Sequence, residues 1–296
     1  MKYICLVVLF ILLSNCKSEH NQNSNEQILE VKDIEEIETV FSDTIQNIDK
    51  DIQPIEKAIS IELKQKKLIE KPDEREKFQS LIIDKSYVVD KKDYTINFKY
   101  PLLNESIKPT HSNFNEFINE YYVNITKTES EILESKLLCD SIEAITFREE
   151  RFIDYKIFIA NDELVSVLFY KENFYSGAMH SSYSFDGFNF DLNKGGFMTY
   201  EDFFIEGSED DLLVIINEQI RKKAGKGDLY YDCWELSLED FFLGKNNFVL
   251  NDTNLEFYFD DCVMCPSYTG TYSIELPLKV LKPVLKKYDA NPLRIQ

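Results

Sequence analysis

Histidine is scarce in this chain. Only three histidines occur among 296 residues, at His20, His111 and His180. A Ser-His-Asp triad could use only His111 or His180, and no Gly-x-Ser-x-Gly turn accompanies either of them. The sequence therefore favours a protein that is not an enzyme. We interpret His180 as a loop residue hydrogen-bonded to the backbone rather than as a general base or a ligand.

Long apolar runs are also lacking after residue 15, so no membrane-spanning helix is expected there. The one such run, Ile4 to Leu13, follows the short basic start Met1-Lys2. As a helix it would reach only about 15 Å, half of a bilayer's hydrocarbon core. A short apolar run behind a basic start is typical of a secretion signal that is removed after export. We therefore predict a signal peptide at residues 1–15.

The next residues, Leu13-Ser14-Asn15-Cys16, resemble the lipobox of bacterial lipoproteins, in which a leucine lies three residues before the lipidated cysteine. Asn15 departs from the pattern, because Gly, Ala or Ser is usual there. We predict that Cys16 is lipidated and anchors the protein in the bacterial cell envelope, at the outer membrane. The alternative is ordinary signal cleavage that leaves Cys16 unmodified.

Basic residues are few relative to acidic ones. The chain has 33 Lys and Arg against 53 Asp and Glu, a formal net charge of −20. Such a field repels phosphate backbones and anionic lipid, and it attracts cationic proteins at low salt. Nucleic acid is therefore excluded as a partner, and a cationic protein is favoured. The alternative is that the acidity only keeps the surface soluble.

Glycine is absent and aromatic residues are nearly absent between Cys16 and about Lys85. Apolar residues spaced seven apart form one helical stripe, which Pro54 interrupts. We predict a lipidated tether and an amphipathic helical stalk at residues 16–85, with a partner-binding coiled coil as the alternative. The stripe comprises Ile34, Phe41, Ile48 and Ile55.

Strands and helices are expected in mixed blocks from about Ser86 onward. We predict an α+β fold with a mainly antiparallel sheet packed against helices, preceded by a helical or disordered N-terminal tether. Pro101 is expected to end the first strand, and residues 197–204 to resume the sheet or enter a short helix. The expected strands are 94–100, 147–160, 164–174, 183–192, 248–250, 255–259 and 272–276, and the expected helices are 112–138, 210–224, 237–242 and 278–288.

Four cysteines follow the signal segment, and in an exported protein they are disulfide candidates. Three pairings are possible, and Cys233 paired with Cys262 or Cys265 would connect the central segment to the last hairpin. A redox site is disfavoured because Cys262 and Cys265 fall between strands, not at a helix start, and a four-cysteine zinc site is the other alternative. We predict no metal and no cofactor. The candidates are Cys139, Cys233, Cys262 and Cys265.

Several short motifs follow one another in a recognisable order. They are Tyr175-Ser176-Gly177-Ala178-Met179-His180, Phe188-Asn189-Phe190-Asp191-Leu192, Gly195-Gly196, Thr199 to Phe204, Phe248 to Leu250, Leu255 to Phe259 and Pro266-Ser267-Tyr268-Thr269-Gly270. Their order resembles the DUF3298 domain of RsiV-type anti-sigma factors and PdaC-type proteins, here at residues 176–289. Residues 86–175 are similar to the DUF4163 or PdaC-like region that usually precedes it. The inserted Met179 and the cysteines at 262 and 265 depart from the family pattern.

The resemblance implies a binding surface, because in the anti-sigma members this domain recognises lysozyme. It implies binding roles for Tyr175, Ser176, His180, Pro266 and Tyr268. Our first hypothesis is a non-enzymatic envelope lipoprotein that binds a cationic protein such as lysozyme, or peptidoglycan. The second is an enzyme of the cell wall, a hydrolase or deacetylase-associated protein, that uses a pair of carboxylates. The third is a structural envelope component built around the stalk.

Overall fold

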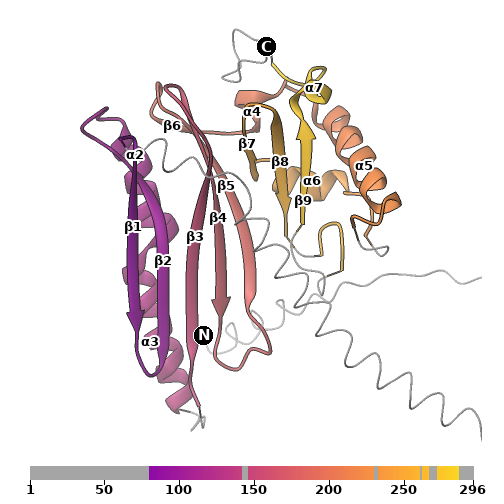
Figure 1. Cartoon of the computed structure of the whole chain (residues 1–296). Coiled ribbons are helices and arrows are strands. Elements are labelled where there is room, and N and C mark those ends of the chain that lie inside the picture. The colour runs from indigo at the N-terminus through magenta and orange to yellow at the C-terminus, as the bar shows by residue number, and fades with distance from the viewer. Residues whose placement is uncertain (1–79, 142–145, 230–232, 261, 267–271, 287–296) are drawn as a thin grey trace, which may run out of the picture. The chain divides into compact units, whose positions relative to one another are not determined.

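The computed structural model describes residues 80–141, 146–229, 233–260, 262–266 and 272–286 (Figure 1). The chain divides into two compact units, Met1–Ile55 and Glu56–Gln296, and all described residues belong to the second. The signal peptide, Cys16 and the stalk at Ile34 to Ile59 lie outside the described residues, so these features stay predictions.

A six-stranded sheet forms the first half of the described chain. Its strands lie side by side in chain order, and every neighbouring pair is antiparallel except β2 and β3, which are parallel. A parallel pair requires a long crossover connection, and a helical segment supplies it here. The strands are β1 (Ile82–Asp90), β2 (Tyr94–Leu103), β3 (Glu149–Ala160), β4 (Leu164–Phe174), β5 (Ser182–Asp191) and β6 (Gly196–Met198).

The crossover helix is broken into three parts, where the sequence predicted one. These are α2 (His111–Glu116), the π-helix η2 (Phe117–Val123) and α3 (Ile125–Ser141). The break falls at Asn124, whose φ of 32° is left-handed, a conformation that asparagine tolerates better than most residues. The apolar face nevertheless packs on the sheet as the spacing predicted, because the core side chains of these helices and of β2 to β5 form one buried cluster.

A second, three-stranded sheet carries the C-terminal half. It is antiparallel, with β8 between β7 and β9, and helices pack with it around a separate apolar core (Figure 1). The fold is therefore α+β with mainly antiparallel strands, as predicted. The elements are α4 (Tyr200–Phe203), α5 (Glu209–Gly225), α6 (Leu238–Gly244), β7 (Phe248–Leu250), β8 (Asn254–Phe259), β9 (Tyr272–Pro277) and α7 (Leu278–Leu281).

Three boundaries differ from the prediction. Strand β1 begins at Ile82, inside the segment predicted as tether. Pro101 lies within β2, because pairing with β3 ends at Phe98 and only pairing with β1 continues beyond it. Helix α7 ends at Leu281 rather than at residue 288, and Pro283, which has no backbone N–H to donate to a helical carbonyl, follows it.

The two sheets meet through a small aromatic cluster and close backbone contacts. Phe185 on β5 and Tyr258 on β8 stack with ring centroids 5.4 Å apart. At Gly187 a Cβ would come within 2.6 Å of the carbonyl oxygen of Phe248, so only glycine allows this approach. The Asn189 side-chain amide donates to the same carbonyl at 2.9 Å. These contacts hold strands β5 and β7 close to each other.

Candidate functional site: an acidic groove beside strand β5

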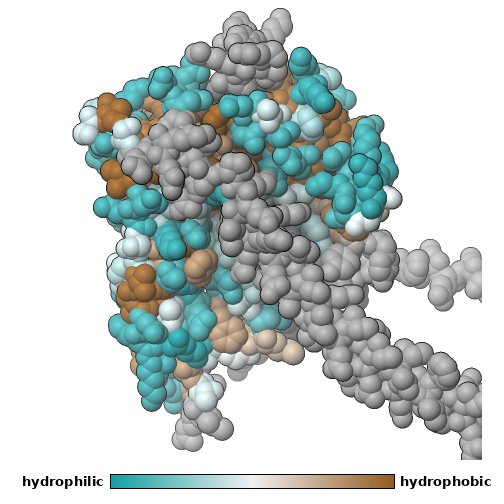
Figure 2. Space-filling view, in the orientation of Figure 1, coloured by the Kyte–Doolittle hydropathy of each residue, from teal (hydrophilic) through white to brown (hydrophobic). Residues whose placement is uncertain are grey.

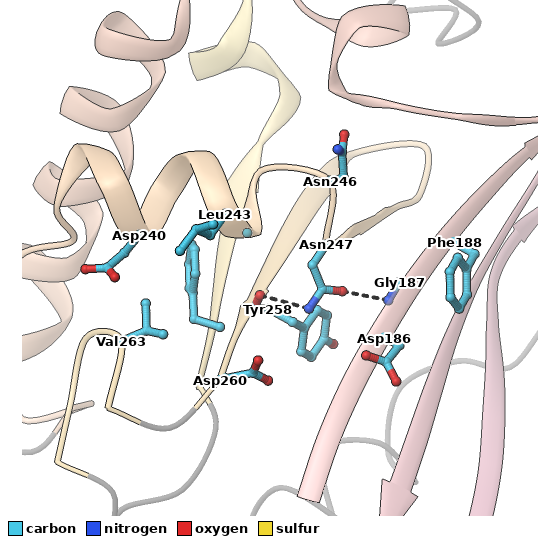
Figure 3. A pocket seen from close by; sticks show the side chains of 12 residues that line it. Asp186, Gly187, Phe188, Asp240, Leu243, Asn246, Asn247, Tyr258, Asp260 and Val263 are labelled. Carbon is cyan, nitrogen blue, oxygen red and sulfur yellow. Dashed lines mark hydrogen bonds between the residues drawn. The ribbon is translucent and has the colours of Figure 1, made fainter. Parts of the chain in front are cut away.

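A cavity of about 420 Å³ lies between strand β5 and the α6–β8 part of the second sheet. It combines three carboxylates with aromatic and aliphatic side chains and two amides (Figure 3). We call it the acidic groove. It is lined by Asp186, Gly187, Phe188, Asp240, Leu243, Gly244, Asn246, Asn247, Tyr258, Phe259, Asp260 and Val263.

Asn247 joins the two walls of the groove. Its side-chain amide donates to the carbonyl oxygens of Phe185 at 2.8 Å and Tyr258 at 3.1 Å. Its side-chain oxygen accepts the N–H of Gly187 at 2.7 Å, and its backbone oxygen accepts the N–H of Tyr258 at 2.9 Å. Figure 3 shows Asn247 between Tyr258 and Gly187, with two of these bonds drawn. One residue thus bonds both sheets and fixes their spacing.

Asp186 is held by two hydroxyl groups. Its Oδ2 accepts the Tyr122 hydroxyl at 2.7 Å and the Ser184 hydroxyl at 3.1 Å. Burial, followed by the neighbouring charge of Asp186, raises the pKa of Tyr122 well above its usual value, so this phenol stays a neutral donor. The ammonium of Lys171 lies 4.2 Å from the centre of the Tyr122 ring, and burial lowers its pKa. This network holds the Asp186 carboxylate toward η2, on the face of β5 opposite to the second sheet.

Helix α6 supplies an apolar and an acidic side chain to the opposite wall. Ser237 caps the helix, because its hydroxyl oxygen accepts the Asp240 N–H at 3.1 Å and its O–H donates to the Asp240 carboxylate at 2.6 Å. Leu243 is 84% exposed. Phe242 on the same helix is also exposed. This wall therefore offers anchors for a bound molecule.

A disulfide supports the floor of the groove beside Val263. Cys233 is bonded to Cys265, which is one of the two pairings that the sequence left open for Cys233. Next to it, the Trp234 backbone N–H donates to the carbonyl of Met264 at 2.8 Å, and its indole N–H donates to the carbonyl of Val263 at 3.1 Å. Of the other candidates, Cys139 has a free thiol, and Cys262 lies outside this bond.

The negative charge of the chain is concentrated in its C-terminal part. Residues 201–279 hold 17 Asp and Glu against 6 Lys and Arg, a net charge of 6 − 17 = −11 of the −20 for the whole chain. On the face drawn in Figure 2, hydrophilic residues cover most of the described surface, and hydrophobic residues come between them in small groups. Most of the residues that line the acidic groove therefore come from an acidic part of the sequence.

The first of the two predicted binding loops does not line this groove. Tyr175 and His180 are exposed between β4 and β5, and the Nδ1 of His180 is 3.2 Å from the carbonyl oxygen of Ser181. The Tyr175 ring covers the Arg151 guanidinium at 4.1 Å, and the Ser176 hydroxyl oxygen accepts the Arg148 N–H at 3.4 Å. This loop is an arrangement separate from the groove-lining residues.

The second predicted loop begins beside the groove. Asp260 and Val263 line the cavity just before it, and Pro266 is half-buried after the disulfide. Tyr268 lies outside the described residues, and its binding role stays a prediction. The sequence does not single out Asp186, Asp240 or Asn247, since single carboxylates and amides on different elements carry no spacing signal in so acidic a chain.

No group of three or more His, Cys, Asp or Glu side chains that could hold a metal ion occurs within residues 80–141, 146–229, 233–260, 262–266 and 272–286. Over the same ranges, none of the helices combines the length and the apolar character that crossing a bilayer would need.

Comparison with protein families identifies the C-terminal part. Residues 201–279 match the family described as "Protein of unknown function (DUF3298)". This region, which includes α6, Asn247 and β8, is a DUF3298 domain, as the motifs predicted. The matched range is shorter than the predicted 176–289 and starts after β5, so one wall of the groove precedes it.

Known relatives cover only part of this chain. The peptidoglycan-N-acetylmuramic acid deacetylase PdaC of Bacillus subtilis is 28% identical over 150 residues, which are 49% of this chain and 31% of PdaC. An esterase of Mycobacterium tuberculosis is 24% identical over 110 residues, 36% of this chain and 47% of that protein. The chain thus spans a third to a half of these relatives.

A solved structure agrees with the fold. The crystal structure of a DUF3298 family member from Bacteroides fragilis aligns with a TM-score of 0.53 at 18% sequence identity. The alignment covers 70% of this chain and 94% of that chain. At this identity the likeness concerns the fold alone.

Proposed function

We propose that this protein is a non-enzymatic lipoprotein of the bacterial cell envelope whose acidic groove binds a cationic protein such as lysozyme. In this proposal Cys16 anchors it at the outer membrane, and the predicted tether carries the DUF3298 domain away from the lipid. Peptidoglycan is the alternative ligand. The proposal rests on the observation that three acidic residues and an exposed leucine line the same groove.

The physical basis is that charge and apolar contact act together at protein interfaces. The carboxylates of Asp186, Asp240 and Asp260 attract lysine and arginine side chains, and the net charge of the domain accelerates their encounter. Leu243 and the neighbouring Phe242 would bury apolar area on a partner, and large apolar side chains dominate binding energies. A cationic protein surface with an apolar recess fits both features.

The proposal is tested by isothermal titration of lysozyme into the full chain, with Asp240→Asn and Asp260→Asn combined. Asparagine at 240 keeps an oxygen that can accept the Ser237 hydroxyl, so the helix cap remains. We expect binding by the native protein at low salt and an affinity about tenfold lower for the variant. We also expect the native affinity to fall as salt shortens the Debye length below about 10 Å.

The matched control changes the same number of charges away from the groove. Asp162 in the turn between β3 and β4 and Glu134 on α3 are exposed, and Asp162→Asn with Glu134→Gln removes two negative charges. Its lysozyme affinity is expected to stay within about threefold of the native value. Equal losses in both variants would mean that only net charge matters, and no binding at low salt would reject the protein partner.

A second candidate function is chemistry on the cell wall, and the names of the two relatives favour it. A deacetylase or esterase would need an acid and a base, for which the groove offers Asp186, Asp240 and Asp260. The deciding experiment incubates peptidoglycan with the full chain and measures acetate and soluble fragments. Release that is lost in Asp186→Asn and Asp260→Asn would replace the binding proposal, and no release is the outcome we expect.

A further inference from the structure

Along one edge of β5, seven of its ten residues have no strand beside them in the part of the chain that the structure describes. β4 pairs with β5 from Ser182 to Asp191, whereas β6 pairs only with Asn189 to Asp191 on the other side. Among the described residues, no strand pairs with Ser182 to Phe188 along that second edge. Figure 1 shows β6 beside only one end of β5. An open edge offers unpaired backbone groups to another chain.

The hydrogen bonds of Asn247 show on which side of β5 the backbone N–H and C=O groups of each residue lie. The Gly187 N–H and the Phe185 carbonyl both bond to the Asn247 side chain, so the backbone groups of these residues point away from β4. Because backbone groups alternate between the two sides of a strand, the N–H and C=O of Tyr183 point the same way. The backbone N–H and C=O groups of Ser182 and Ser184 point toward β4. The edge therefore presents the Tyr183 N–H and C=O and the Phe185 N–H.

The Asn247 side chain makes hydrogen bonds to this edge that the backbone of a neighbouring strand would otherwise make. Its amide fills the two edge positions at Phe185 and Gly187, as a neighbouring strand would. Beyond Asn247 the groove begins, and Figure 3 shows Asp186 and Asp260 on either side of Tyr258 there. A chain laid along the open edge would thus meet carboxylates where it reaches Asn247.

We propose that the open edge of β5 at Tyr183 and Phe185 binds a short extended segment of a partner protein by strand addition, with a lysine or arginine side chain directed into the acidic groove. This deepens the proposed function and rests on it, since the same groove supplies the charge. The main chain of the segment gives affinity through strand hydrogen bonds, and its basic side chain gives selectivity. Charge complementarity with Asp240 and Asp260 selects a basic occupant.

The first test uses two peptides on the native full chain. One is the capped heptapeptide of alternating lysine and valine, and the other is the same sequence methylated on every internal backbone nitrogen. Both carry the same charge, but only the first can donate strand hydrogen bonds. We expect the plain peptide to bind at least about tenfold more tightly in a fluorescence anisotropy titration. Equal affinities, or no binding of the plain peptide, would overturn the proposal.

The second test removes one donor from the protein. Tyr183→Pro deletes the edge-facing N–H and leaves those of Ser182 and Ser184, and Tyr183→Phe is the matched control that keeps it. We expect Tyr183→Pro to abolish the difference between the two peptides and Tyr183→Phe to preserve it. If Tyr183→Pro fails to fold by circular dichroism, the peptide comparison on the native chain still decides.

The two proposals can fail separately. If lysozyme does not bind but the plain peptide binds in preference to its methylated form, the lysozyme function is rejected and the edge remains a docking site for a basic strand. If lysozyme binding depends on Asp240 and Asp260 while the two peptides bind equally, the groove stands and strand addition is rejected.

Discussion

Replacing Glu149 with alanine is expected to destabilise the protein by about 3–5 kcal/mol, because it leaves a buried arginine without its counter-charge. Glu149 and Arg151 lie two residues apart on the same face of β3, and both side chains are almost fully buried. Their charged atoms are 2.5 Å apart. Such a loss is a large part of the roughly 5–15 kcal/mol that stabilises a typical domain. Urea unfolding followed by circular dichroism measures it.

A double variant separates the charge effect from packing. Glu149→Leu with Arg151→Met removes both charges and keeps similar volumes, so we expect it to be more stable than Glu149→Ala by at least about 2 kcal/mol. If the single change costs less than about 1 kcal/mol, water reaches the pair and its burial does not matter.

The buried Glu149–Arg151 pair also orients Tyr175, a residue of the predicted binding loop. Arg151 donates to the carbonyl of Phe174 at 3.0 Å and lies under the Tyr175 ring. The pair thus holds the end of β4 in place and packs against one face of the exposed Tyr175 ring. This is the physical basis on which Tyr175, a predicted binding residue, has a fixed orientation.

Removing the disulfide is expected to cost roughly 3–4 kcal/mol of unfolding free energy, because the bond closes a loop of 32 residues and restricts the unfolded chain. The change is Cys233→Ala with Cys265→Ala, which avoids placing a hydroxyl at the buried position 265. Thermal unfolding of the variant measures the loss. The native protein in reducing agent should show a similar decrease.

Cys139→Ala is the matched control for the disulfide. It removes a thiol that is not in the bond, and we expect a change below about 1 kcal/mol. The disulfide variant should also bind any groove ligand more weakly, since Trp234 and Val263 lie beside the bond. A variant that loses stability but keeps full affinity would show that the bond does not hold the groove in shape.

Most strands and helices were predictable from local pattern. The apolar runs of β3 and β4, the alternation in β5 and the turn at Asn161-Asp162 predicted those strands to within about two residues. β1 was not predicted, since six of its nine residues are exposed and its sequence has no clear alternation. Helical spacing alone predicted α7 to reach residue 288, whereas Pro283 follows the end of the helix at Leu281.

The groove was not predictable, although its parts were visible. Asp186, Asp240 and Asp260 come from β5, α6 and the segment after β8, and nothing in their spacing relates them. Asn247 looks like an ordinary residue before a short strand. Its role depends on a sheet edge that lies 60 residues away in the sequence.

The sequence by itself determined the α+β class, the DUF3298 domain, the strong acidity and a short set of possible cysteine pairings, because these follow from periodicity, motif order, composition and count. The tertiary structure alone decided that Cys233 pairs with Cys265, that most of one edge of β5 is unpaired among the described residues and that three distant acidic residues line one groove. The reason is that local pattern governs burial along each element, whereas contacts between elements arise only from how the two sheets pack.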